Sequence, residues 1–211
     1  ALDHDKGLNT GGMGTVAPNP YYTPAVAERC MQEIFLPTVA AMQAEGCPFK
    51  GCLYFGLMLT PDGPKVIEYN CRFGDPETQV VLPLLESDLL TVMEATTNGT
   101  LDKTDVKFSD GAAACVILAS GGYPLAYEKG KEITGLTAGQ LDAADVTVYH
   151  AGTAIKDGRL VTNGGRVLGV TATANTLPEA LKKAYAATES IHFDKLHKRS
   201  DIGARALAAM Q

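Results

Sequence analysis

KVIEYNCRFGDPETQ (Lys65–Gln79) joins a short apolar strand to a charged loop, and the rest of the chain can be read outward from it. Val66 and Ile67 are β-branched, which favours an extended strand. Gly63-Pro64 is a turn signal before them, and the apolar run Cys52–Leu59 precedes that turn. The stretch therefore predicts a β-hairpin.

One face of the second strand carries polar groups. Side chains alternate along an extended chain, so Glu68 and Asn70 should point the same way, together with Arg72 if the strand continues that far. Carboxylate and amide oxygens suit a hard cation, and an arginine fork neutralises phosphate. This face fits magnesium held against a polyphosphate. The alternative is a solvent-facing strand on which Glu68 and Arg72 form a surface ion pair.

The loop after the strand is unusually charged. Phe73–Glu77 contains turn residues and two acids, and Gln79 follows shortly after. A purely structural turn seldom needs so many charged groups, so the loop favours the binding interpretation.

Two glycine-rich stretches lie far from this hairpin in the sequence. Asn9–Gly14 (NTGGMG) is either a plain tight turn or a loop whose backbone N–H groups approach an anion. It lacks the Gly-Lys-Ser/Thr ending of a P-loop. Thr162–Ala172 (TNGGRVLGVTA) places Arg166 after a Gly-Gly turn. That arginine either offers a bidentate fork to a phosphate or pairs with a neighbouring acid at a strand end.

Composition limits the classes of partner. The chain has 211 residues, 45% of them hydrophobic, which is enough for one large domain or two small ones. Its net charge of −6 disfavours nucleic acid and anionic membranes, which bind clustered Lys and Arg. The five cysteines form no C-x-x-C pair, so neither zinc nor a disulfide framework is indicated. We expect a cytoplasmic protein that binds small molecules, with no nucleic acid and no membrane partner.

Helices are predicted on both sides of the hairpin. One should run over Thr23–Gly46, beginning with a Thr-Pro cap, and Pro37 should kink or split it. Two short helices are expected at 76–85 and 87–96, the second with Ser87 as its cap.

The character of the chain changes after about residue 100. Strands are predicted at 112–119, 132–136, 146–155 and 166–173. Thr176 and Glu179 form a capping-box pattern for a helix ending near Ile191, and an Ala-rich helix should follow in the tail. A domain boundary is expected between 100 and 110.

The strings EYNCRFGDPETQ, NTGGMG and TNGGRVLGVTA together resemble the phosphoribosylamine-glycine ligases (glycinamide ribonucleotide synthetases) of purine biosynthesis, a family of ATP-grasp enzymes. The similarity covers the whole chain but only the C-terminal half of such an enzyme. It implies an α+β protein: the C-terminal part of an ATP-grasp domain over 1–105, mostly antiparallel sheet with helices, and a small mixed α/β C-terminal domain over 106–211. Asp3 and His4 match the family's Asp-His-Lys stretch without its lysine.

The resemblance also implies a reaction. Such enzymes use ATP as a co-substrate to convert glycine to glycyl phosphate, which 5-phosphoribosylamine attacks to give glycinamide ribonucleotide, ADP and phosphate. The missing N-terminal half of the same enzyme would be a partner, and this chain alone should be inactive. The resemblance assigns the following site residues: Glu68 and Asn70 to Mg²⁺ (or Mn²⁺) and cofactor binding; Arg72 to cofactor binding and a catalytic phosphate contact; and Gly12, Asp75, Pro76, Glu77 and Arg166 to substrate binding.

Two other functions remain open at this point. The chain could belong to another ATP-grasp ligase of the biotin carboxylase or formate-using type, although the GDPETQ and TNGGRVL strings argue against that. It could also be a non-catalytic fragment that acts through interactions.

Overall fold

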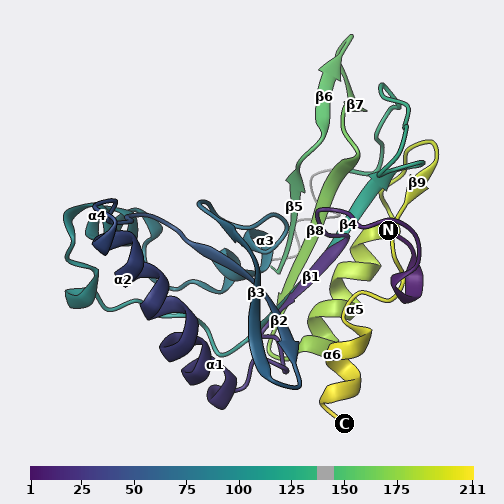
Figure 1. Ribbon diagram of the computed structural model, residues 1–211. Coiled ribbons are helices and arrows are strands. Elements are labelled where there is room, and N and C mark those ends of the chain that lie inside the picture. The colour runs from purple at the N-terminus through teal and green to yellow at the C-terminus, as the bar shows by residue number, and fades with distance from the viewer. Residues whose placement is uncertain (137–144) are drawn as a thin grey trace. The chain divides into compact units, whose positions relative to one another are not determined.

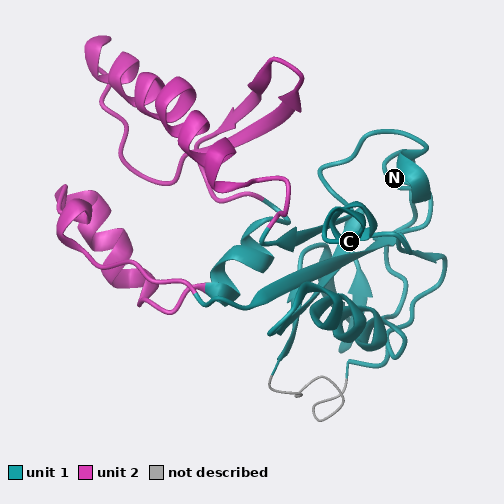
Figure 2. Ribbon diagram, turned by 90° about the horizontal axis from the view of Figure 1, so that it is seen from below, with its two compact units in different colours: residues 1–18, 75–84, 109–211 teal, residues 19–74, 85–108 magenta. Residues whose placement is uncertain are grey.

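The computed structural model describes residues 1–136 and 145–211, which form two compact units. Unit 1 contains residues 1–18, 75–84 and 109–211, and unit 2 contains residues 19–74 and 85–108 (Figure 2). Each unit is therefore discontinuous in the sequence. The division into family domains at 105/106 is a different kind of boundary and stays a prediction.

An antiparallel sheet forms the centre of unit 1 (Figure 1). Its strands β1 (Gly14–Ala17), β4 (Ala112–Ser120), β8 (Arg166–Ala174) and β5 (Val146–His150) lie in that order, and β9 (Leu196–His197) pairs with the end of β4. All nine residues of β4 are buried. This explains why its sequence is apolar from Ala112 to Ala119 rather than alternating.

Helices cover both faces of β4 and β8. On one face α5 (Leu177–Thr188) packs against a buried cluster rich in alanine, which includes Ala114, Val116 and Ala172. On the other face α3 (Thr78–Val81) and the short 3-10 helix η3 (Leu82–Leu84) cover Ala113, Cys115 and Ile117. The tail helix α6 (Ala204–Ala209) adds Ala206 to the first cluster. Small side chains let the helices approach the sheet closely.

Two strand predictions in unit 1 need correction. The segment 146–155 is not one strand, because β5 ends at His150 and a separate hairpin, β6 (Thr153–Lys156) and β7 (Arg159–Thr162), follows. A Cβ on Gly152 would lie 2.5 Å from the Arg166 carbonyl oxygen, so the chain turns here through a glycine. The segment 132–136 forms only isolated bridges, at Glu132 and Thr134.

The predicted hairpin is present in unit 2. Strands β2 (Tyr54–Thr60) and β3 (Gly63–Asn70) pair antiparallel, from Thr60 opposite Gly63 to Tyr54 opposite Asn70. The turn, however, is Pro61-Asp62, and Gly63-Pro64 already belongs to β3. Gly63 has a φ of 108°, a conformation that glycine adopts without strain.

The long helix of unit 2 is divided as its proline predicts. Thr23 caps α1 (Pro24–Cys30) by accepting a hydrogen bond from the Val26 N–H, and α2 (Leu36–Ala44) continues it. A π-helical segment, η2 (Met31–Phe35), separates them. The wider turn lies just before Pro37, which has no N–H to donate to the preceding turn.

Two helix caps differ from the sequence predictions. Asp88, not Ser87, caps α4 (Leu89–Asn98), because its carboxylate accepts from the Thr91 N–H at 2.8 Å. Ser87 is engaged elsewhere, with its Oγ accepting from the Lys107 N–H at 2.7 Å. Thr176 makes no side-chain cap bond to α5, so the predicted capping box is wrong, and the helix ends at Thr188. The last element of unit 2 is the 3-10 helix η4 (Leu101–Lys103).

The two units differ in how much apolar surface they bury. Among the described residues, the three buried apolar clusters all lie in unit 1. Of the 22 exposed large hydrophobic side chains in the described part of the chain, 16 belong to unit 2, among them Ile67 and Tyr69 on β3. A two-stranded hairpin without such a cluster is marginally stable by itself. The predicted α+β class is confirmed, and its stable core lies in unit 1.

No helix in the described part of the chain combines the length and apolarity that a bilayer span requires.

Candidate functional site

The end of β3 presents paired oxygen ligands in unit 2. The Asn70 Nδ2 donates to the Glu68 Oε1 at 3.1 Å, which confirms that the two side chains share a face. This bond leaves the second carboxylate oxygen of Glu68 and the amide oxygen of Asn70 without a partner among the described residues. A Cβ on the opposite residue, Gly56, would lie 2.8 Å from the Glu68 Cγ, so glycine at this position makes room for the acid. The isolated glycine within a strand was the available sequence signal for it.

Arg72 does not extend this face. The strand ends at Asn70, and the Arg72 Nη1 donates to the adjacent carbonyl of Phe73 at 2.8 Å. Within the residues that the structure describes, Glu68 and Arg72 form no ion pair, although the surface-pair interpretation requires one. The exposed guanidinium keeps most of its donors available for another group.

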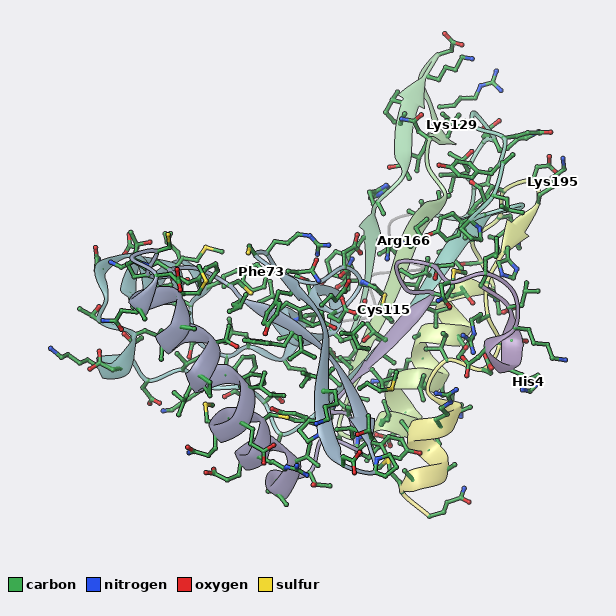
Figure 3. All side chains as sticks on the ribbon, viewed as in Figure 1. His4, Phe73, Cys115, Lys129, Arg166 and Lys195 are labelled. Carbon is green, nitrogen blue, oxygen red and sulfur yellow. The ribbon has the colours of Figure 1, made fainter. Side chains whose placement is uncertain are left out.

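In unit 1 a single guanidinium connects three sequence motifs. The Arg166 Nη1 donates to the carbonyls of Gly11 and Asp75, each at 2.8 Å, and its Nη2 donates to the Asp75 Oδ2 at 3.1 Å. Figure 3 labels Arg166 and Cys115, which come from the neighbouring strands β8 and β4. The alternative that Arg166 pairs with a neighbouring acid is therefore realised in the structure. One side chain joins NTGGMG and GDPETQ to TNGGRVL.

The glycines of these motifs are explained by close packing. A Cβ on Gly11 would lie 3.1 Å from the Arg166 Nη2, and one on Gly12 would lie 2.7 Å from the Cδ of Pro76, which is fully buried. A Cβ on Gly165 would lie 2.2 Å from the ring of Tyr123. The Gly-Gly pairs allow backbone and side chains to approach where any larger residue would collide.

The loop after Arg72 holds two acids that differ in their hydrogen bonding. Both carboxylate oxygens of Asp75 are used, one by Arg166 and the other by the Gln79 Nε2 at 2.9 Å. The Glu77 carboxylate, by contrast, accepts no hydrogen bond from the described residues. It is therefore the acid of this loop that is available to a ligand.

The predicted site residues fall into two sets. Unit 1 brings together Gly12, Asp75, Pro76, Glu77 and Arg166, and unit 2 carries Glu68, Asn70 and Arg72. No group of three or more His, Cys, Asp or Glu side chains with metal-binding geometry occurs in the described residues. The only predicted metal ligands in this part are the Glu68 and Asn70 oxygens.

The Asp3-His4 segment is fastened to the tail of the chain. Asp3 accepts from the Ser200 N–H and Oγ, and the His4 N–H donates to Asp201. The Arg199 guanidinium donates to Asp201 and to Asp5, and it holds the pKa of Asp201 well below its usual range. These contacts give the segment a structural role within unit 1.

Burial separates the reactive from the protected cysteines. All five are free thiols, and burial raises the pKa of the Cys115 thiol to about 11. Because the thiolate is the nucleophile, we expect iodoacetamide at pH 8 to label the exposed Cys47 and Cys71 while Cys30 and Cys115, both buried, stay unmodified. Peptide mass spectrometry measures this. Labelling of Cys115 as fast as Cys71 would contradict the burial of β4.

Family models and known proteins match this chain near both of its ends. The family model described as phosphoribosylglycinamide synthetase, ATP-grasp (A) domain, matches residues 1–78, and the model for the C domain of the same synthetase matches residues 113–205. A phosphoribosylamine-glycine ligase of Vibrio vulnificus is 50% identical over 210 residues, which is 99% of this chain and 48% of the relative. The bifunctional purine biosynthetic protein ADE1 of Schizosaccharomyces pombe is 49% identical over 98% of this chain and 26% of its own length.

Solved structures agree with these sequence matches. The structure of a phosphoribosylamine-glycine ligase from Thermotoga maritima matches with a TM-score of 0.83 and 41% sequence identity. The match covers 95% of this chain and 49% of the Thermotoga chain. The biotin carboxylase subunit of a pyruvate carboxylase matches with a TM-score of 0.60 at 17% identity, which shows a shared fold alone. The chain spans about half the length of the ligases that it matches. Because the models for two domains of the same synthetase match in sequence order, the chain belongs to the phosphoribosylglycinamide synthetase family and carries part of the ATP-grasp domain together with the C domain.

Proposed function

We propose that the chain is part of an ATP-dependent ligase that joins glycine to 5-phosphoribosylamine through glycyl phosphate, releasing ADP and phosphate. The observation that carries this proposal is the convergence of three family motifs on Arg166 within unit 1. One charged side chain holds these three segments together, and a substrate site built from all three motifs needs them close to one another. The other half of the ligase supplies the remaining surfaces. The enzyme acts in the cytoplasm, where the reducing environment is consistent with the five free thiols of this chain.

Glu68 and Asn70 are suited to hold the cation. The oxygens that their mutual hydrogen bond leaves available are a carboxylate and an amide oxygen, which magnesium and manganese both accept. Water and phosphate oxygens would supply the rest of the cation's ligands. The chemistry supplied by the bound cation is neutralisation of charge on the transferring phosphoryl group.

The remaining residues bind and orient the substrates. Arg72 offers its remaining donors to the transferring phosphoryl group or to the acyl phosphate. The loop Asp75-Pro76-Glu77 lies on the glycine side, and the unpaired carboxylate of Glu77 suits the substrate ammonium group. Gly12 belongs to the loop that borders this site. Positioning the amine in line with the acyl carbon is the main contribution that such a site makes.

Arg166 is suited to anchor the phosphate of phosphoribosylamine. Its recorded hydrogen bonds leave the Nε–H and one Nη2–H without a partner among the described residues. In the full-length enzyme, Arg166→Ala should raise the KM for phosphoribosylamine by up to about 10²-fold, the value of a lost charged hydrogen bond of ~1.5–3 kcal/mol, and leave the KM for ATP nearly unchanged.

A matched control is Arg159→Ala, which removes a more exposed arginine that pairs with Glu132. Steady-state kinetics with each substrate varied in turn makes the comparison. If Arg166→Ala raises both Michaelis constants equally, or raises neither, Arg166 does not bind the phosphate of phosphoribosylamine.

A further inference from the structure

Asp75 is committed to contacts within unit 1. Its Oδ2 accepts from the Arg166 Nη2 at 3.1 Å, its carbonyl accepts from the Arg166 Nη1 at 2.8 Å, and its Oδ1 accepts from the Gln79 Nε2 at 2.9 Å. Each carboxylate oxygen thus accepts one hydrogen bond from within unit 1, and the two bonds tie Asp75 to both Arg166 and Gln79. We propose that Asp75 is a positioning residue that aims Arg166 at an anion. This inference rests on the proposed phosphate role of Arg166.

The geometry of the guanidinium supports this role. An arginine has five N–H donors in a rigid plane. Nη1 donates to the carbonyls of Gly11 and Asp75 and Nη2 donates to the Asp75 carboxylate, which leaves the Nε–H and one Nη2–H without a partner among the described residues. Two parallel donors match two oxygens of a phosphate monoester. The side chain is 20% exposed, so its surroundings hold it while solvent still reaches it.

Gln79 fixes Asp75 in turn. Its amide donates to the Asp75 Oδ1, and its Oε1 is buried without a hydrogen-bond partner among the described residues. Exchanging the two ends of the amide would place an acceptor against the carboxylate, so the orientation with Nε2 toward Asp75 is the favourable one. Because Gln79 lies on α3, the helix, Asp75 and Arg166 on β8 form one connected chain of contacts.

A simpler role for Asp75 makes the opposite prediction. If its carboxylate were only the counter-ion of Arg166, it would compete with an anion, and its removal would strengthen anion binding. If it positions the guanidinium, its removal lets Arg166 turn away, and anion binding weakens. The sign of the change therefore distinguishes the two roles.

The test uses the ¹⁵N-labelled 211-residue chain and ribose 5-phosphate as the probe. The NMR signal of the Arg166 Nε–H is followed during the titration. We expect Asp75→Ala to weaken binding by about tenfold or more, as for loss of a charge-assisted hydrogen bond. Asp75→Asn keeps an acceptor oxygen and should bind within about threefold of the unsubstituted chain, because the positioning contact survives.

Asp145→Ala is the matched control. Asp145 is 51% exposed and pairs with Lys183, whereas Asp75 is 48% exposed and pairs with Arg166. The control removes the same charge elsewhere in unit 1 and should leave binding unchanged. If Asp75→Ala does not fold by circular dichroism, Gln79→Leu releases the carboxylate without a change of charge, and it should weaken binding by about threefold.

Unchanged or tighter binding by Asp75→Ala would overturn the positioning role. The same result with Gln79→Leu would overturn it where that variant is used instead. An Arg166 NMR signal that does not shift when ribose 5-phosphate is added would also overturn it. The titration involves no turnover. Failure of the proposed ligase function would appear separately, as a full-length enzyme that forms no ADP when ATP, glycine and phosphoribosylamine are supplied.

Discussion

Glu68→Gln in the full-length ligase is expected to lower turnover by about 10²-fold or more, the loss typical when a preorganised charge stabiliser is removed. The substitution keeps the size of the side chain and its hydrogen-bonding capacity toward Asn70, but it removes the negative charge from the oxygen that we propose binds the cation. A neutral amide oxygen binds a divalent cation far more weakly than a carboxylate does. Rates measured over a range of magnesium concentrations test the assignment.

Folding should survive this substitution, because Glu68 is exposed and, among the described residues, its side chain hydrogen-bonds only to Asn70. Asp62→Asn is a suitable control, since it neutralises a carboxylate in the turn at the far end of the same hairpin. It should change neither turnover nor melting temperature. Near-normal turnover of Glu68→Gln at saturating magnesium would contradict the assignment of Glu68 as a metal ligand.

Leu168→Ala is expected to lower the free energy of unfolding of unit 1 by about 2–5 kcal/mol. Leu168 lies on β8 and is fully buried in a cluster with Leu118 and Ile191. Deleting its side chain removes apolar contacts from both a sheet and its covering elements, and the antiparallel pairing with β4 limits how far the site can collapse. Native-state hydrogen exchange of the β4 amides measures the change.

The matched comparison is Ile67→Ala in unit 2. Ile67 also lies on a strand, but 61% of its surface is exposed. Its truncation should cost no more than about 0.5 kcal/mol, as for most surface substitutions. Equal costs for Leu168→Ala and Ile67→Ala would mean that unit 2 has a buried core comparable with that of unit 1, contrary to the observed burial.

Local features of this protein could be predicted because they depend on residues close together in the sequence. The alternation of side chains along a strand was enough to place Glu68 and Asn70 on one face. The Thr23-Pro24 cap and the interruption before Pro37 follow from backbone groups that proline and threonine supply or remove. The three motifs likewise identified the family, since each is a short contiguous string.

Small competitions between neighbours were harder to predict. Ser87 and Asp88 are both residue types that cap helices well. The backbone N–H of Lys107 donates to the Ser87 hydroxyl, and the Asp88 carboxylate is the group that caps the helix. The capping-box pattern at Thr176 is present in the sequence, yet its hydroxyl makes no cap bond. Such choices depend on a partner that lies outside the local pattern.

By itself, then, the sequence determined the hairpin, the shared face of Glu68 and Asn70, and the family. Only the tertiary structure decided that Asp75 and Arg166, 91 residues apart, are partners, and that β1 pairs with β4. It also decided that the glycines at 11 and 12 serve packing against Arg166 and Pro76. The physical reason is that periodicity specifies local dihedral angles and exposed faces, whereas the choice among distant partners depends on which strands and helices bury their apolar faces together.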